Sequence, residues 1–250
     1  MNPTQATDFI FGTWPVIEAL RKGQEIEKIL IVHGIRSAQI SEITGLAKEN
    51  NVPVQYVPVE KLNRITRKNH QSVIAFVSPV VYQTIEQLIP MIYDEGREPF
   101  ILMLDRVTDV RNFGAIARSA EAAGVDAILI PSRGSALITA DAVKTSAGAL
   151  TRINVCRMDN LKTTIDFLKD SGLTIAAVSE KAEKLIWENE LSGPIALILG
   201  SEEDGISDAY LKKADIHLKF PMTGKVASLN VSVASGLACF EVLRQRINQK

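Results

Sequence analysis

Four short apolar runs constrain the fold of this 250-residue chain more than any other feature. FILMLD, AILIP, LTIAAV and IALILG all lie between residues 100 and 200, and none alternates strictly between apolar and polar residues. Strands of this kind are buried on both faces, which is typical of a parallel sheet covered by helices. Helical segments such as RNFGAIARSAEAAG and LKTTIDFLKDSG separate the runs. The sequence therefore predicts an α/β domain with a mostly parallel sheet.

The first 80 residues show a smaller α/β pattern of their own. Thr13 is predicted to cap a helix through TWPVIEALRKG, and SAQISEITGLAKENN has a helical period. KILIVHG, VQYV and VIAFVSP are predicted strands. The polar segment 81–98 ends in Pro and Gly signals and is predicted to connect two domains. The expected division is 1–80, a linker over 81–98, and 99–250.

Charge favours no particular partner for the whole chain, because its net charge is −1. Residues 1–80 carry nine Lys and Arg against seven Asp and Glu, whereas residues 81–250 carry nineteen against twenty-two. The sharpest local feature is KLNRITRKNH, with Lys61, Arg64, Arg67 and Lys68. Arg64, Arg67 and Lys68 recur at helical spacing, which predicts one basic helix face. A solvated helix end explains the same pattern.

The sequence predicts no disulfide framework, no metal site and no membrane segment. Cys156 and Cys239 lie far apart and form no CxxC motif, which favours a reducing compartment, and we expect the cytoplasm. The three histidines are scattered, so no metal site is predicted. We expect no membrane span and no signal peptide, because no charged-then-apolar leader and no run of about 18 apolar residues is present.

The turn GSEEDGIS follows the predicted strand IALIL and has two glycines at the spacing of a phosphate loop. Ile206 stands where such a loop needs lysine, and three carboxylates in the turn would repel triphosphate oxygens. The turn is therefore not a nucleotide phosphate loop. It would tolerate a positively charged ligand such as a sulfonium, although an ordinary surface turn is an equally simple explanation.

Two further segments carry polar residues at the start of predicted helices. In LDRVTDVRNFGAIARSAEAAG, Asp105 closes a strand, Asn112 is predicted as the helix N-cap, and Arg118 lies in the second turn. A plain cap followed by an arginine beside a core stripe fits this segment too. In FPMTGKVASLNVSVASGLACFEV, Ser228 and Asn230 precede a helix rich in Ser, Ala and Gly.

Taken together and in this order, three patterns resemble the motifs of the SpoU/TrmH family of RNA 2′-O-ribose methyltransferases, which belongs to the SPOUT superfamily. The patterns are D-x-x-x-x-x-x-N-x-G-x-x-x-R, L-G-x-E-x-x-G and P-M-x-G-x-x-x-S-L-N-V-S-V-A. This resemblance covers residues 100–250 and implies a deep trefoil knot, S-adenosyl-L-methionine as cofactor, and a homodimer formed through the catalytic domain. Residues 1–80 resemble the ribosomal-protein-like RNA-binding domain of one subgroup. Two departures are Ser72, where glycine is usual, and Phe220, where isoleucine is usual.

The resemblance also implies the site. Its catalytic set would be Asn112, Arg118, Glu202, Ser228 and Asn230, and its cofactor contacts would fall at Gly200, Gly205, Phe220 and Leu229. Glu202 is expected to hold Arg118 in place. A guanidinium group has a pKa of about 12 or more and is a poor base near neutrality. Two roles for Arg118 therefore stay open: proton acceptor in a perturbed site, or clamp for a phosphate and the developing oxyanion.

The expected reaction is methylation of a ribose in RNA, with a guanosine of 23S rRNA as the target that the two-domain resemblance implies. One alternative is a tRNA 2′-O-ribose methyltransferase, although such relatives generally lack a domain like residues 1–80. The other is a catalytically silent RNA-binding assembly factor on the same fold, against which the intact polar set argues. The small residues of the last helix are expected to let another backbone segment approach closely, while an Ala-rich core helix fits the composition equally well.

Overall fold

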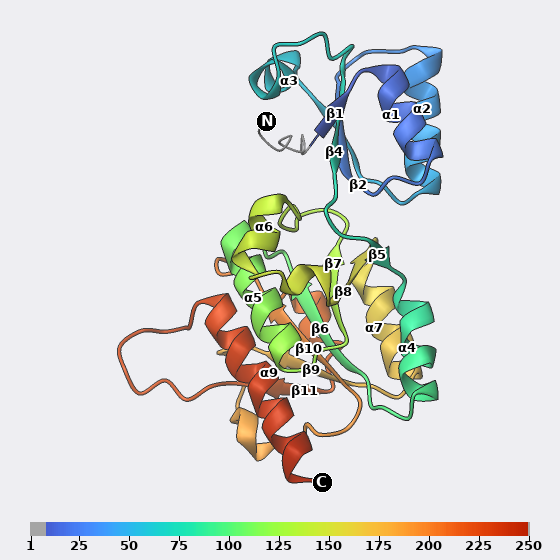
Figure 1. Ribbon diagram of the computed structural model, residues 1–250. Helices are drawn as coiled ribbons and strands as arrows, with labels where there is room; N and C mark the ends of the chain where they lie inside the picture. The colour runs from blue at the N-terminus through green and yellow to red at the C-terminus, as the bar shows by residue number, and fades with distance from the viewer. Residues whose placement is uncertain (1–8, 250) are drawn as a thin grey trace, which may run out of the picture. The chain divides into compact units, whose positions relative to one another are not determined.

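The computed structural model describes residues 9–249. Contacts divide the chain into two compact units, which are coloured along the chain in Figure 1. The first unit comprises the residues up to 81, and the second comprises those from 82 onward, except that 138–140 group with the first. Each unit contains one β-sheet.

The first unit is a four-stranded sheet with three helices. Its elements are β1 (Phe9–Phe11), α1 (Thr13–Arg21), β2 (Ile26–Val32), α2 (Ala38–Glu49), β3 (Val54–Val57), α3 (Val59–Ile65) and β4 (Val73–Val77). The strand order is β1-β4-β2-β3, in which β4 pairs antiparallel with both neighbours and β3 is parallel to β2. Helices α1 and α2 pack on one face, where Ile17, Ile29 and Ile43 are fully buried. The predicted small α/β unit is thus present.

Two local predictions for this unit are corrected. Gly12, with φ of 92°, occupies the N-cap position of α1, and Thr13 is the first helical residue. Helix α3 ends at Ile65 because Thr66 adopts an extended backbone, with φ of −148° and ψ of 140°. Arg67 and Lys68 therefore lie beyond the helix, and the predicted single basic helix face does not form.

The second unit is built on a seven-stranded sheet in the order β11-β9-β10-β6-β7-β8-β5. The strands are β5 (Tyr82–Gln83), β6 (Phe100–Asp105), β7 (Ala127–Pro131), β8 (Asn154–Met158), β9 (Thr174–Val178), β10 (Ile195–Gly200) and β11 (Ile216–Leu218). Neighbouring strands pair parallel throughout. Every residue of β6 and β10 is buried, as the unbroken apolar runs predict.

Helices cover both faces of this sheet (Figure 1). They are α4 (Ile85–Asp94), α5 (Val110–Ala122), α6 (Ala140–Thr145), α7 (Leu161–Asp170), α8 (Asp208–Leu211) and α9 (Val231–Asn248), with 3₁₀ turns at Ala149–Thr151 and Ile186–Glu188. One cluster joins Ile89 of α4 and Ile165 of α7 to the inward side chains of β6, β7 and β10. On the other face α5 packs against α9.

The segment 81–98 differs from the predicted linker. Its first residues form β5, which pairs with β8 at the edge of the large sheet, and the following residues form α4. Ile85, Ile89 and Ile92 of α4 are buried and form one apolar stripe at helical spacing. Pro90 inside the helix obscured this stripe in the sequence. Residues 82–98 are therefore part of the second unit.

Among residues 9–249, no helix is both long enough and apolar enough to cross a membrane.

Candidate active site

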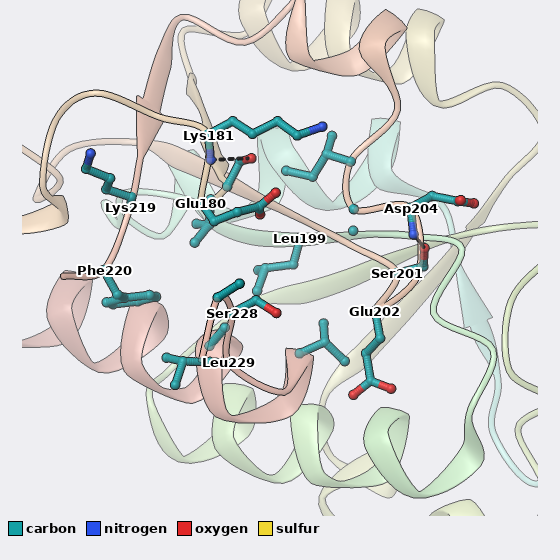
Figure 2. A pocket seen from close by; sticks show the side chains of 18 of the residues that line it. Glu180, Lys181, Leu199, Ser201, Glu202, Asp204, Lys219, Phe220, Ser228 and Leu229 are labelled. Atoms are coloured by element: carbon teal, nitrogen blue, oxygen red, sulfur yellow. Dashed lines mark hydrogen bonds between the residues drawn. The ribbon is translucent and has the colours of Figure 1, made fainter. Parts of the chain in front are cut away.

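A cavity of about 400 Å³ lies at the carboxyl end of the parallel sheet, where open α/β sheets bind ligands. Its wall comes from four segments: those after β9, β10 and β11, and the start of α9. Figure 2 shows Phe220, Ser228 and Leu229 on one side and Ser201, Glu202 and Asp204 on another. All four residues predicted to contact a cofactor line this cavity: Gly200, Gly205, Phe220 and Leu229.

The turn after β10 is unusually tight, and its two glycines explain why. A Cβ atom on Gly200 would lie only 1.9 Å from the backbone carbon of Gly205. Gly205 itself has φ of 66°, and its amide donates to the carbonyl oxygen of Ser201 over 3.0 Å. The turn therefore folds back onto the end of β10 and presents its backbone to the cavity.

A second cavity of about 380 Å³ adjoins the first and shares part of its wall. Its lining combines the segment after β6, the start of α5, the same acidic turn and the start of α9: Arg106, Val107, Thr108, Asp109, Asn112, Ser201, Glu202, Glu203, Asp204 and Val231. Glu202 lines both cavities. The two cavities therefore lie on either side of the same acidic turn.

Three predicted site residues meet at this border although they are far apart in the chain. Asn112 donates from Nδ2 to Glu202 Oε1 over 3.1 Å, and Asn230 donates from Nδ2 to Asn112 Oδ1 over 3.1 Å. Asn230 also donates to Glu202 Oε1. The acidic turn, α5 and α9 are thus joined through one carboxylate and two amides.

Helix capping fixes two of these side chains. Asp109, rather than the predicted Asn112, is the N-cap of α5, and its Oδ1 accepts from the Asn112 amide over 2.8 Å. This leaves the Asn112 side chain free to reach Glu202. Asn230 is the N-cap of α9, because its Oδ1 accepts from the Ser232 amide over 3.0 Å. Ser228, the other polar residue before α9, lines the first cavity instead.

Within the chain, the structure does not bring the expected pair Arg118 and Glu202 together. The Arg118 side chain is exposed and lines neither cavity. Within residues 9–249 it makes no hydrogen bond or ion pair, whereas Glu202 is held by the two asparagines. The Arg118 side chain therefore has no polar partner among the described residues.

Arg106 is the main site residue that sequence reasoning missed. Its guanidinium group donates to Asp105 Oδ1 over 3.0 Å, to Asp204 Oδ2 over 2.9 Å and to the Gly205 carbonyl over 3.3 Å. Asp105 is buried, and its Oδ2 also accepts from the Ser207 amide over 2.7 Å. The hydrogen bond to Asp105 raises the pKa of Arg106. The one sequence signal for this role of Arg106 is its position directly after the strand that ends at Asp105.

The charge of the first cavity suits a cationic ligand. Four carboxylates line it, from Glu180, Glu202, Glu203 and Asp204, against the ammonium groups of Lys181 and Lys219. The segment with Glu180 and Lys181 was not predicted, although it too follows a strand of the parallel sheet. Within residues 9–249, no group of three or more His, Cys, Asp or Glu side chains is arranged to hold a metal ion.

Comparisons with known proteins agree with this architecture. Residues 99–240 match the SpoU rRNA Methylase family, and residues 9–83 match the domain described as RNA 2'-O ribose methyltransferase substrate binding. The Bacillus subtilis (strain 168) protein named "Putative TrmH family tRNA/rRNA methyltransferase YacO" is 34% identical over 243 residues, or 97% of this chain and 98% of that protein. A Staphylococcus epidermidis relative with the same family name is 38% identical over 237 residues, 95% of each chain.

Solved structures show the same fold. A crystal structure of an RNA 2'-O ribose methyltransferase superposes with a TM-score of 0.57 at 26% identity and covers 96% of this chain and 88% of its own. The AdoMet-bound rRNA methyltransferase from Sinorhizobium meliloti superposes with a TM-score of 0.60 at 24% identity and covers 94% and 86%. The fold and the site thus define an RNA methyltransferase of the SPOUT class. The chain belongs to the SpoU/TrmH family of RNA methyltransferases.

Proposed function

We propose that this protein transfers a methyl group from S-adenosyl-L-methionine to a ribose 2′-oxygen of RNA, most specifically a guanosine of 23S rRNA. The observation that carries the proposal is the pair of adjoining cavities that share the acidic turn, with Glu202 on their border. One cavity would hold the cofactor and the other the target nucleotide. A transfer reaction needs such an arrangement, because the donor and acceptor atoms must come within about 3–3.5 Å.

The first cavity fits this cofactor in size and chemistry. Its volume of about 400 Å³ lies in the range of small-molecule sites. Phe220, Leu199 and Leu229 offer apolar surface for an adenine ring, while the backbone around Gly200 offers hydrogen-bonding groups. The excess of carboxylates stabilises positive charge. When bound, the cofactor supplies a methyl group on a positively charged sulfur.

The protein's own residues would position the ribose and take its proton. Asn112 and Asn230 orient the carboxylate of Glu202 at the border of the cavities. That carboxylate can accept the hydroxyl proton, a role that adds to the two we hold open for Arg118. Because Arg118 has no partner among residues 9–249, it is available to clamp an RNA phosphate or to accept the proton itself.

Single-turnover methylation of an rRNA fragment at saturating RNA tests these roles. Arg118→Ala should leave cofactor affinity nearly unchanged and slow the reaction on the order of a hundredfold, the usual scale for losing a charge contact or a base. Arg118→Lys should rescue little if a bidentate contact is needed. A near-normal rate for Arg118→Ala would remove Arg118 from the catalytic set. Calorimetry that detects no binding of S-adenosylmethionine or its demethylated product would overturn the proposed function.

The rRNA target is favoured by the first unit. Residues 9–83 match a substrate-binding domain of RNA 2'-O ribose methyltransferases, and the match of residues 99–240 is to an rRNA methylase family. The tRNA alternative remains the second candidate, because the curated relatives carry both substrates in their names. Mapping of ribose methylation in rRNA and tRNA from cells that lack the protein decides between them.

We also propose a homodimer formed through the second unit, in the cytoplasm. Helix α9 leaves an apolar stripe exposed: Val233 is 50% exposed, Leu237 48%, Phe240 48% and Ile247 61%. These residues recur at helical spacing, as expected for a helix that packs against a second copy. Light scattering of a fragment without residues 1–81 should give a dimer mass, and Leu237→Lys should give a monomer. Both cysteines are free and buried, which suits a reducing compartment.

The deep trefoil knot that the family resemblance implies stays a prediction. The burial of Ser235 and Ala238 on α9 is compatible with the close approach of another segment that such a knot requires.

A further inference from the structure

The sheet of the first unit has one face that its helices cover only in part. Helices α1 and α2 bury the face that carries Ile29, Ile31, Val73 and Ala75. On the opposite face, among the described residues of this unit, α3 is the one helix that packs, and its Leu62 contacts the cluster around Leu30, Val57 and Ile74. The remainder of that face is left to side chains that are only partly buried.

Three phenylalanines gather on this remainder. Strand register places Phe9 of β1 directly opposite Phe76 of β4, and Phe11 opposite Ile74. The ring centroids of Phe9 and Phe76 are 6.2 Å apart, and those of Phe9 and Phe11 are 6.3 Å apart. All three rings are partly buried, so each keeps some accessible surface. The result is an aromatic platform on a sheet.

Two lysines lie over these rings. Lys28 pairs with Phe76 in the strand register, and its Nζ lies 5.4 Å from the Phe76 ring centroid. Lys68 Nζ lies 6.0 Å from the Phe11 centroid. Burial lowers the pKa of Lys28, and the positive charge of Lys61 on α3 lowers it further, against a smaller opposing effect of Glu27.

These three lysines, Lys28, Lys61 and Lys68, have no salt-bridge partner in the described part of the chain. Glu27 offsets only part of the repulsion between Lys28 and Lys61, and a bound anion would relieve the rest. We call the set Phe9, Phe11, Phe76, Lys28, Lys61 and Lys68 the aromatic–lysine surface.

We infer that the aromatic–lysine surface holds a single-stranded segment of the RNA substrate, with bases stacked on the phenylalanines and phosphates held by the lysines. Aromatic side chains inside a positively charged groove are the usual arrangement for binding single strands without strict sequence preference. An acidic protein would use the lysines but would gain little from flat ring faces. The inference rests on the proposed function, because it assumes that the substrate is RNA.

Fluorescence anisotropy with the full-length protein and a labelled twelve-nucleotide oligoadenylate tests it. Phe76→Leu keeps an apolar side chain but removes the ring, and we expect affinity to fall roughly tenfold, the scale for losing one stacked base. Tyr56→Leu is the matched control, because Tyr56 alternates with Val57 on β3 and so lies on the opposite face of the same sheet. It should bind as the wild type does.

Salt dependence tests the lysines separately. Lys28→Gln and Lys61→Gln should each reduce the slope of log affinity against log salt by about 0.7, the value for one phosphate contact on a single strand. Lys48→Gln, on exposed α2 surface, should leave the slope unchanged. Thermal unfolding of each variant checks that the first unit is still folded.

The inference is overturned if folded Phe76→Leu binds the oligonucleotide normally, or if Tyr56→Leu weakens binding equally. Displacement of the oligonucleotide by polyglutamate from wild type and Phe76→Leu alike would also overturn it, and would indicate an acidic protein partner. A failure here leaves cofactor binding and rRNA methylation intact. Conversely, wild-type protein that binds oligoadenylate but no S-adenosylmethionine would contradict the proposed function and leave the inference about the aromatic–lysine surface standing.

Discussion

At the scale of single residues, Arg106 shows how backbone strain and charge are combined. Its φ of 59° lies in the left-handed region, which costs a residue with a Cβ atom about 1–2 kcal/mol. The conformation is held because the guanidinium group bridges Asp105, at the end of β6, and Asp204, in the acidic turn after β10. Arg106 is thus a positioning residue for the turn that lines both cavities.

Two substitutions separate these effects. Arg106→Ala and Arg106→Gly both remove the bridge, and we expect each to raise the dissociation constant of S-adenosylmethionine about three- to tenfold, since partly exposed ion pairs contribute up to about 1 kcal/mol each. Only Arg106→Gly also relieves the backbone strain, so it should unfold at a higher temperature than Arg106→Ala. Calorimetry and thermal melts measure the two quantities. Unchanged affinity in both variants would show that the turn holds its shape without Arg106.

The glycines of the acidic turn make a second matched pair. The methyl group added by Gly205→Ala meets open space. The variant should therefore lose only about 1–2 kcal/mol of folding stability, because the left-handed backbone at this position is the sole penalty. Gly200→Ala places a methyl group inside the backbone of 205–206, so the turn must move. We expect Gly200→Ala to weaken cofactor binding well over tenfold. Equal cofactor affinity in the two variants would contradict the packing that the structure shows.

At the scale of elements, sequence pattern predicted most of the fold but not its exceptions. The unbroken runs FILMLD and IALILG correspond to β6 and β10. Strands that are apolar on both faces are stable at the centre of a sheet, where helices cover both faces. Helix starts were harder to predict. Asp109 and Asn112 are both good N-caps, and only the three-dimensional structure shows that Asp109 caps while Asn112 turns toward Glu202.

The site was predicted as a set of residues rather than as a geometry. The resemblance to family motifs predicted that Asn112, Glu202 and Asn230 belong to one site, and hydrogen bonds join their side chains in the structure. Within the chain, Glu202 contacts Asn112 and Asn230 rather than Arg118. A contact between segments about 90 residues apart depends on tertiary packing that local pattern does not encode. Arg106 was missed for the same reason, since its acceptor Asp204 lies 98 residues further along the chain.

The segment with β5 and α4 yields a prediction about independent folding. A fragment of residues 82–250 keeps Ile85, Ile89 and Ile92 on their face of the sheet and should unfold cooperatively. A fragment of residues 99–250 exposes that face, and the loss of three buried isoleucines should cost several kcal/mol, at about 2–5 kcal/mol for each large aliphatic side chain removed. Urea unfolding and dye binding distinguish the two. Equal stability of the two fragments would indicate that residues 82–98 act as a linker.

At the scale of the whole molecule, the thiols of the second unit couple stability to pH. Cys156 in β8 and Cys239 in α9 are both fully buried. Burial raises the pKa of each thiol from its ordinary value of 9.0 to about 12. Below pH 9 both states of the chain keep the thiols protonated, so the stabilising effect of this shift is fully present. As pH rises above 9 the unfolded chain loses those protons first, and stability falls until the folded thiols ionise as well.

We therefore expect the unfolding free energy of the wild type to fall above pH 9 more steeply than that of a Cys156→Ala/Cys239→Ala variant. The excess slope approaches about 1.4 kcal/mol per pH unit for each thiol, because one proton is then released on unfolding at each site. Tyrosines and lysines titrate in the same range, but they contribute equally to both proteins and cancel in the difference. The variant loses some packing at every pH, which lowers its unfolding free energy by a constant amount and leaves the slope against pH unchanged. Urea unfolding under reducing conditions between pH 8 and 11 measures the difference. Parallel curves would show that the thiols ionise as readily in the folded protein as in the unfolded chain, and that water reaches both sites.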